Sequence, residues 1–269
     1  MIVRYAHAGD ALTGAREHQE DAFAFAFPDA RALYFTSSGR VDGQGALLAV
    51  LADGMGGHVA GALASRTAAE TFVAAYSAAR EDGDSRLPRA LQRANAAVAT
   101  AAREPGRDGM GSTLLAVVFG DAGLSWVSVG DSPLFLFRAG RLYQLNEDHS
   151  LGALLDKLAA DGEIDAAYAA THPRRHHLRS ALTGGAIEHV DLNAGPVALE
   201  SGDWVVLASD GVETVSHAAI ADVLAAHAQG TPQALCRALT AAIAAAGNPY
   251  QDNATVLVVR PEFAEVAVG

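Results

Sequence analysis

Acidic residues stand at the ends of several apolar stretches of the sequence, usually beside a glycine. They are Asp53 after LLAVLA, Asp131 after LSWVSVG, Asp210 after WVVLAS, Asp252 before NATVLVV, and Glu20 with Asp21 before AFAFAF. A carboxylate at the rim of an apolar core is costly unless another group neutralises its charge. The pattern therefore predicts that a specific partner compensates these acids.

Divalent cations are the partner that the pattern favours. Too few lysines and arginines lie near these acids in the sequence to pair with all of them. If the acids converge, their repulsion must be relieved, and hard cations such as Mg²⁺ or Mn²⁺ prefer oxygen ligands. The alternative for any single acid is a solvent-facing turn, because Asp and Gly are ordinary turn formers. Several such positions together favour the metal site.

The segment LADGMGGHVAG, residues 51–61, combines Asp53 with closely spaced glycines. Gly54, Gly56 and Gly57 would let the backbone approach the site, so that a main-chain carbonyl could serve as a further oxygen ligand. Two phosphate-binding loops are excluded. No lysine follows as GxxxxGK[ST] requires, and Val59 stands where GxGxxG needs its last glycine.

Composition limits the classes of partner. The formal net charge of −12 argues against nucleic acid and anionic membranes, which select basic surfaces. The single cysteine, Cys236, excludes an internal disulfide and is expected to be a buried helix residue. No signal peptide opens the sequence, and no stretch approaches the roughly 20 apolar residues of a membrane helix, so we expect a cytosolic protein.

Hydrophobic patterning predicts the elements that position the acids. Strands are expected over 3–7, 22–27, 46–52, 112–119, 124–129, 133–138, 203–209 and 254–260. Helices are expected over 58–80, 87–103, 151–160, 218–228 and 232–246. The Gly-Asp turns at 120–123 and 130–132 are typical of hairpins, and a hairpin or irregular loop is expected between the second and third strands.

The order of these elements predicts the fold class. Strands, two helices, strands, two helices and a last strand do not alternate as a doubly wound parallel sheet requires. We expect an α+β fold, a four-layer α-β-β-α sandwich in which two antiparallel sheets are flanked by helix pairs. Nothing marks a linker, so a single domain over 1–269 is expected.

The motifs resemble, in chain order, the metal-dependent serine/threonine protein phosphatases of type 2C (PPM) in their bacterial form. The matching segments are RxxQED at 16–21, DGMGG at 53–57, GST at 111–113, VGDS at 129–132, EDHS at 147–150, HPRR at 172–175 with LTG at 182–184, LASDG at 207–211 and DNAT at 252–255. Gln19 replaces the usual Asn, and Pro133 replaces the usual Arg after VGDS. The ordered set covers nearly the whole chain, which makes the resemblance specific.

The resemblance implies the sandwich fold and two Mn²⁺ or Mg²⁺ ions at one end of it. By motif position, Asp53 would bridge both ions, the Gly54 carbonyl would bind one, and Asp210 and Asp252 the other. Glu20 would act through metal-bound water. The remaining assignments are a third ion at Asp131 with Asp210, and supporting roles for Asp21 and Asn253.

The implied reaction is hydrolysis of phosphoserine or phosphothreonine by a hydroxide that bridges the metals. Arg16 would offset charge on the phosphoryl oxygens, since a guanidinium can bind them through paired hydrogen bonds. The general acid is open. Eukaryotic relatives place a histidine directly after the Asp-Gly pair, where this chain has Met55, so His58 is the candidate and metal-bound water the alternative.

Residues 151–185 correspond to the flap of this family. Their dense basic cluster, residues 174–179, would either contact a phosphorylated or acidic substrate or form salt bridges with the chain's own acids. The resemblance implies a monomer that acts on phosphorylated proteins, opposing a bacterial serine/threonine kinase. Two alternative functions are a catalytically silent phosphoprotein-binding relative and a small-phosphoester hydrolase. The retained acids argue against the first, and the second stays open.

Overall fold

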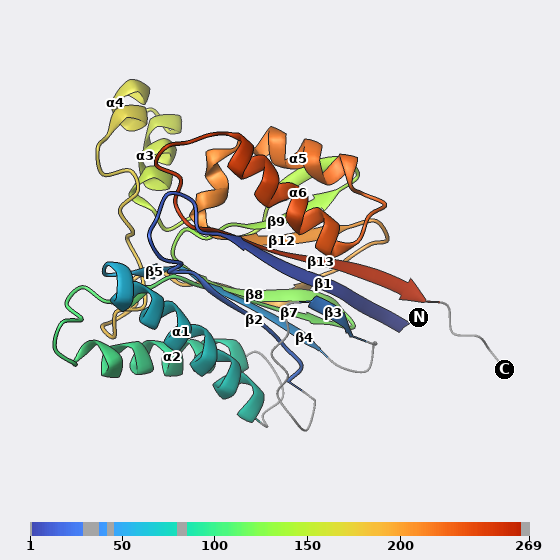
Figure 1. Ribbon diagram of the computed structural model, residues 1–269, viewed down its shortest axis with the longest axis horizontal. Helices are drawn as coiled ribbons and strands as arrows, with labels where there is room; N and C mark the ends of the chain where they lie inside the picture. Colours follow the sequence, from blue (N-terminus) through green and yellow to red (C-terminus); the bar gives the residue numbers. More distant parts are fainter. Residues whose placement is uncertain (1, 29–37, 42–45, 80–84, 265–269) are drawn as a thin grey trace.

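The computed structural model describes residues 2–28, 38–41, 46–79 and 85–264. Two large antiparallel sheets pack face to face between two pairs of helices, so the predicted four-layer sandwich is confirmed (Figure 1). The six-stranded sheet has the order β10 (Arg141–Gln144), β9 (Leu134–Arg138), β12 (Trp204–Ala208), β13 (Ala254–Ala264), β1 (Ile2–Leu12) and β3 (Ser38–Val41). The five-stranded sheet has the order β11 (Asp191–Val197), β8 (Gly123–Val129), β7 (Leu114–Gly120), β4 (Leu47–Ala52) and β2 (Ala22–Ala26).

The helices form an outer pair on each side and a third group at one end. The outer pairs are α1 (His58–Ala78) with α2 (Arg86–Ala102), and α5 (His217–Ala226) with α6 (Pro232–Ala245). A smaller pair, α3 (Leu151–Ala160) and α4 (Ala166–Thr171), lies at the same end of the sandwich as β5 (Gly54–Met55) (Figure 1). Strand β5 pairs with β6 (Gly111–Ser112). A 3-10 helix, η1 (Asp210–Thr214), follows β12.

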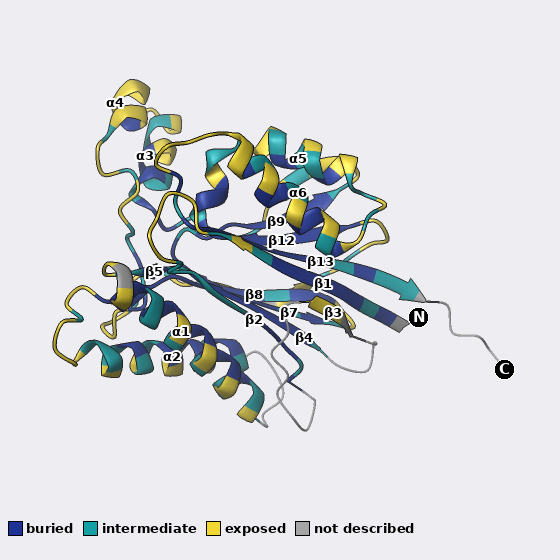
Figure 2. Cartoon of the chain, viewed as in Figure 1, coloured by how far each residue is buried: buried dark blue, intermediate teal, exposed yellow. Residues whose placement is uncertain are grey.

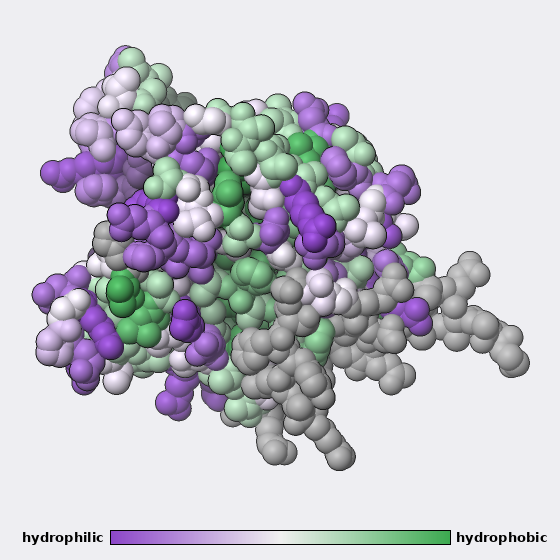
Figure 3. Space-filling model, in the orientation of Figure 1, coloured by the Kyte–Doolittle hydropathy of each residue, from purple (hydrophilic) through white to green (hydrophobic). Residues whose placement is uncertain are grey.

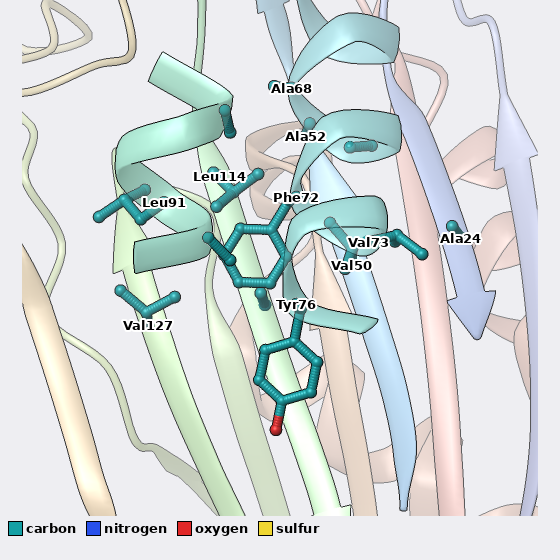
Figure 4. Close-up of a cluster of buried hydrophobic side chains, with 14 of the residues drawn as sticks. Ala24, Val50, Ala52, Ala68, Phe72, Val73, Tyr76, Leu91, Leu114 and Val127 are labelled. Atoms are coloured by element: carbon teal, nitrogen blue, oxygen red, sulfur yellow. The ribbon is translucent and has the colours of Figure 1, made fainter. Parts of the chain in front are cut away.

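The central strands are buried on both faces, which explains their uninterrupted apolar sequence. In β4, Leu48 and Val50 face the helices, whereas Leu47 and Leu51 face the other sheet. Alternation of this kind follows from the two-residue period of a strand. Figure 4 shows Phe72 of α1 between the helices and the sheet, where it is fully buried. The sheets are therefore rigid supports for the loops at their ends.

The second helix pair covers the six-stranded sheet in the same way. Cys236 of α6 is fully buried, as predicted, and its Sγ donates a hydrogen bond to the carbonyl of Ala8 in β1. Burial raises the pKa of this thiol. Figure 2 shows the resulting pattern, with buried residues along both sheets and exposed residues on the outer faces of the helices.

One predicted hairpin is wrong. The turn at 120–123 does join paired strands, since β7 pairs with β8. The turn at 130–132 does not, because β8 lies in the five-stranded sheet and β9 pairs with β12 and β10 in the six-stranded sheet. Gly130, with φ of 108°, turns the chain from one sheet to the other. This crossing carries Asp131 into the space between the sheet ends.

Several short elements were not predicted, namely β5, β6, β10, β11 and α4. They are short or lie at sheet edges, where a hydrophobic period is weak or absent. The loop or hairpin predicted between the second and third strands falls largely on residues outside the described ranges, which include only β3 of it. Within the described ranges, no helix combines the length and the apolar character needed to cross a bilayer.

Candidate active site

One pocket of about 540 Å³ collects most of the acids that the sequence singled out. It lies where loops from both sheets meet, beside β5 and away from the start of β1 and the end of β13 (Figure 1). On the face shown in Figure 3, hydrophilic residues gather around this end, below α3 and α4. The acids that line the pocket are Glu20 before β2, Asp53 after β4, Asp131 between β8 and β9, Asp210 after β12 and Asp252 before β13.

Backbone hydrogen bonds fix Asp53 at the centre of this loop cluster. Its N–H donates to Oγ1 of Thr113 over 2.9 Å, and its carbonyl accepts from the N–H of Thr113 and the hydroxyl of Ser112, each also over 2.9 Å. Thr113 Oγ1 lies 3.1 Å from the hydroxyl of Ser132. The turn that carries Asp131 is therefore tied to the strand end that carries Asp53.

The carboxylates in the pocket repel one another. Burial raises the pKa of Asp53 well above its ordinary value, and the charges of Asp21, Asp210 and other neighbours raise it further. Burial and the charge of Asp210 raise the pKa of Asp131 to about 8. Burial and Asp252 also raise the pKa of Asp210, although the hydrogen bond with Asp53 acts in the opposite direction. In the described ranges, no arginine or lysine forms an ion pair with Asp53, Asp131 or Asp210.

Asp21 lies behind the pocket. Its Oδ2 accepts hydrogen bonds from the hydroxyls of Ser209 and Thr255 over 2.8 and 2.7 Å. Its Oδ1 is buried with no hydrogen-bond partner among the described residues. Burial raises the pKa of this carboxyl to about 6. The Asp21 side chain thus links the strand end that precedes Asp210 to the strand that follows Asp252, and its supporting role stays a prediction.

Asn253 and two glycines hold Glu20 in place. The side-chain oxygen of Asn253 accepts a hydrogen bond from the Glu20 N–H over 2.7 Å. A Cβ added at Gly61 would overlap Oε2 of Glu20, and a Cβ added at Gly54 would overlap the main-chain carbonyl of Gly61. Helix α1 therefore approaches Glu20 through a glycine contact that a larger residue would prevent.

Arg16 brings a positive charge to the pocket. Its guanidinium forms an ion pair with Asp252, and both side chains remain partly exposed, at 54% and 41%. An exposed pair of this kind contributes little to folding stability. The guanidinium therefore lies where a ligand entering the pocket can reach it.

The donor set fits hard divalent cations. The pocket offers carboxylate and main-chain oxygens, its acids raise one another's pKa, and Asp21 keeps a buried oxygen without a partner among the described residues. Among the described residues, no group of three or more His, Cys, Asp or Glu side chains lies close enough together to hold an ion by itself. Mg²⁺ does not need one, since it retains several waters and binds through one or two carboxylates.

Residues of the basic cluster 174–179 have different surroundings in the structure. Arg175 binds both carboxylate oxygens of Asp156 in α3, over 2.8 and 2.7 Å, as the salt-bridge interpretation predicts. His176 and His177 instead line the pocket, as does Leu178. Met55 lines it too, and the side chain of His58, the candidate general acid, lies outside what the structure describes.

Sequence reasoning missed Thr113 as a pocket residue and as the hydroxyl that binds the Asp53 backbone. Its signal was present, because Thr113 belongs to the GST motif, but the motif gave no role to the side chain. Ser209 and Thr255 are a similar case. Each belongs to a recognised motif, and only the fold shows that both donate to Asp21.

Comparison with known proteins gives a consistent result. A profile described as protein phosphatase 2C matches residues 34–242, a range that includes Asp53, Asp131 and Asp210. The serine/threonine protein phosphatase PstP of Mycobacterium tuberculosis (strain CDC 1551 / Oshkosh) is 36% identical over 187 residues, which cover 67% of this chain. The matched region spans only 34% of the length of that relative.

A second relative and a solved structure agree with this similarity. The protein phosphatase PhpP of Streptococcus pneumoniae serotype 2 is 30% identical over 189 residues, covering 68% of this chain and 75% of that protein. A crystal structure of the catalytic domain of the serine threonine protein phosphatase PstP, in complex with 2 manganese ions, has a TM-score of 0.73 and 27% identity. The structural similarity covers 97% of this chain and 100% of that one.

Proposed function

Since the chain belongs to the protein phosphatase 2C family, we propose that it is a metal-dependent phosphatase acting on phosphoserine and phosphothreonine in proteins. One observation carries the proposal. Acids from the ends of strands in both sheets line a single pocket that also contains an accessible arginine. Such a pocket combines oxygen ligands for cations with a cationic group for a phosphoryl oxygen.

The acids of the pocket would hold the ions. Asp53 with the Gly54 carbonyl would hold one Mn²⁺ or Mg²⁺, and Asp53 with Asp210 and Asp252 the other. Glu20 would act through bound water, and Asp131 with Asp210 would hold a third ion. When bound, the ions would make water nucleophilic near neutral pH and offset charge on the phosphoryl group.

The chain's own residues would orient the substrate. Arg16 would direct its guanidinium toward two phosphoryl oxygens, which requires it to share or leave its contact with Asp252. The hydrogen bonds between the Asp53 backbone and the hydroxyl and N–H of Thr113 would hold Asp53 in place while the substrate binds. A fixed carboxylate position matters because a shift of about 1 Å in a reacting geometry can cost about 10²-fold in rate.

The wider setting belongs to the same proposal. Phosphorylated proteins would be the substrates and a serine/threonine kinase would supply them, since the relatives are named serine/threonine phosphatases. We propose a monomer in the cytosol, with one phosphatase domain over 1–269 and a flap at about 151–185. Helices α3 and α4 of that segment lie over the pocket end of the sandwich, which suits a flap (Figure 1).

The test is phosphate release from a phosphothreonine peptide, measured with Mn²⁺, with Mg²⁺ and with a chelator. We expect release only with a divalent ion, and a loss of at least about 10³-fold in D53N, since metal ions contribute several kcal/mol to transition-state stabilisation. Circular dichroism checks that D53N is folded. Equal release in chelator, or from D53N, would show that the proposal is wrong.

A second arm addresses substrate class and ion binding. Comparing kcat/KM on phosphothreonine peptides with kcat/KM on small phosphate monoesters distinguishes a protein phosphatase from a small-phosphoester hydrolase. Thermal melting in Mn²⁺ gives a readout independent of activity. Saturation at 100 times Kd would stabilise the wild type by about 2.7 kcal/mol, and D53N should show a smaller shift.

A further inference from the structure

Two histidines of the 151–185 segment face the reaction pocket. His176 and His177 line it together with Arg16, Asp53, Asp210 and the other pocket acids. Both histidines are exposed residues, so their imidazoles are accessible to a bound substrate. They are the only imidazoles among the described residues that line this pocket. The inference that follows rests on the proposed phosphatase function.

The backbone that carries these histidines is fastened on both sides. Before them, Arg175 binds Asp156, and its carbonyl accepts a hydrogen bond from the Gly152 N–H over 2.8 Å. After them, the His177 carbonyl accepts from the Leu151 N–H over 2.9 Å, and Leu178 forms a β-bridge with Ser150. The histidines are thus presented from an anchored turn, which favours a defined side-chain position.

His176 has the more informative position of the two. It lines the reaction pocket and also a neighbouring pocket of about 310 Å³ that contains Asp131, Asp210 and Glu213. The imidazole therefore stands where the two pockets meet. Burial raises the pKa of Asp210 overall, and the positive charge of His176 partly opposes this increase. A substrate held between the acids and this segment would contact His176.

The reaction needs a proton donor at such a position. A serine or threonine oxygen is a poor leaving group as an alkoxide, so breaking its bond to phosphorus is helped by simultaneous protonation. Met55, which follows the Asp-Gly pair, has no proton to give. Histidine is the side chain most suited to donate a proton near neutral pH.

We propose that His176 is a catalytic residue that protonates the leaving oxygen of the substrate serine or threonine. Water forms the new bond to phosphorus, and the bond between phosphorus and the side-chain oxygen breaks. The bonding electron pair stays on that oxygen, which takes the proton from the His176 imidazolium. The products are the free hydroxyl and inorganic phosphate, and the proton released by the attacking water restores the imidazolium through solvent.

The test compares two leaving groups in H176Q. p-Nitrophenolate leaves without protonation, whereas a threonine oxygen does not. We expect H176Q to lower kcat/KM on a phosphothreonine peptide about 100-fold, within the range of general acid catalysis. The loss on p-nitrophenyl phosphate should be at least tenfold smaller. A second variant, H176A, should regain part of its peptide activity in added imidazole.

The matched control is H172Q, the same substitution in the same segment. His172 does not line either pocket and contacts Tyr168 instead, so H172Q should leave both rates within about twofold of wild type. Equal losses on both substrates in H176Q would overturn the assignment, because they indicate a structural role. A differential loss in H177Q rather than H176Q would overturn it too. A wild type inactive on both substrates would instead contradict the proposed phosphatase function.

Discussion

The two ends of strand β12 carry acids with opposite surroundings, Asp203 buried and Asp210 half-buried. Asp203 directly precedes the strand and Asp210 follows it after Ser209. Asp203 is 1% exposed, and both of its oxygens accept hydrogen bonds from Arg138, over 2.9 and 2.6 Å. Asp210 instead faces other carboxylates, and none of the described arginines or lysines pairs with it.

The difference teaches how to distinguish two kinds of acid at the edge of a core. At Asp203 the fold supplies a cation and also the N–H of Glu200, which donates over 2.7 Å, so the charge is satisfied within the chain. At Asp210 the fold supplies more negative charge. An acid at the edge of the core whose surroundings oppose its charge is a candidate for function, because stability alone would not select such an arrangement.

The largest effect is expected from D210N. This variant should lower phosphatase kcat/KM at least about 10³-fold, since it removes an ion ligand worth several kcal/mol to the transition state. In chelator its unfolding free energy should equal or exceed that of the wild type, because the substitution removes repulsion. Peptide assays and urea unfolding measure the two quantities. A folded D210N protein with wild-type activity would contradict the functional role of Asp210.

D203N should show the opposite pattern. Removing one partner of a buried ion pair leaves an uncompensated charge, and because Arg138 is partly exposed we expect a loss of about 3 kcal/mol, the lower end of the usual range. For a domain of this size the melting temperature should fall by about 6–12 °C. Activity per folded molecule at 20 °C should stay within about twofold. Calorimetry and assays at that temperature provide the check.

Arg16 sharpens the contrast between the two arginine–aspartate pairs. The Arg16–Asp252 pair is exposed, so R16Q should change the unfolding free energy by less than about 0.5 kcal/mol. It should nevertheless lower kcat/KM about 10- to 30-fold, which corresponds to about 1.4–2 kcal/mol and lies in the range for hydrogen bonding to a charged group. R93Q, on the exposed face of α2, is the control. A stability loss in R16Q without an activity loss would make Arg16 a structural residue like Arg138.

The smallest effect concerns pH in chelator. Burial and Asp210 raise the pKa of Asp131 to about 8 in the folded protein, whereas an unfolded aspartate titrates near 4. Between these values the folded state holds a proton that the unfolded state has lost, so stability should fall as pH rises through this window. Urea unfolding at pH 5, 6.5 and 8 should show a shallower decline in D131N. Identical slopes would contradict the shifted pKa.

The sequence predicted the sandwich and the acids that meet in the pocket, because both depend on local patterns. Strands such as β4 have uninterrupted apolar sequences, and the pocket acids lie within two residues of a strand end. The sequence could not separate Asp203 from Asp210. Both adjoin the same strand, and the arginine that distinguishes them lies 65 residues away.

Long-range pairing also explains the other failures. The turn at Gly130 has the composition of a hairpin, and only the partners of β8 and β9 in different sheets make it a crossing. His176 and Arg175 are neighbours in one basic run, yet one lines the pocket and the other binds Asp156. The residue type determines which chemistry a side chain can perform, and the fold determines which groups the side chain contacts.

The buried position of Cys236 has a consequence for redox chemistry. Peroxide and alkylating reagents attack the thiolate, and a thiol enclosed by α6 and β1 with a raised pKa rarely forms one. Phosphatases that use a cysteine nucleophile are silenced by such reagents. This chain has no other sulfhydryl, so the proposed phosphatase activity should persist under oxidising conditions that silence those enzymes.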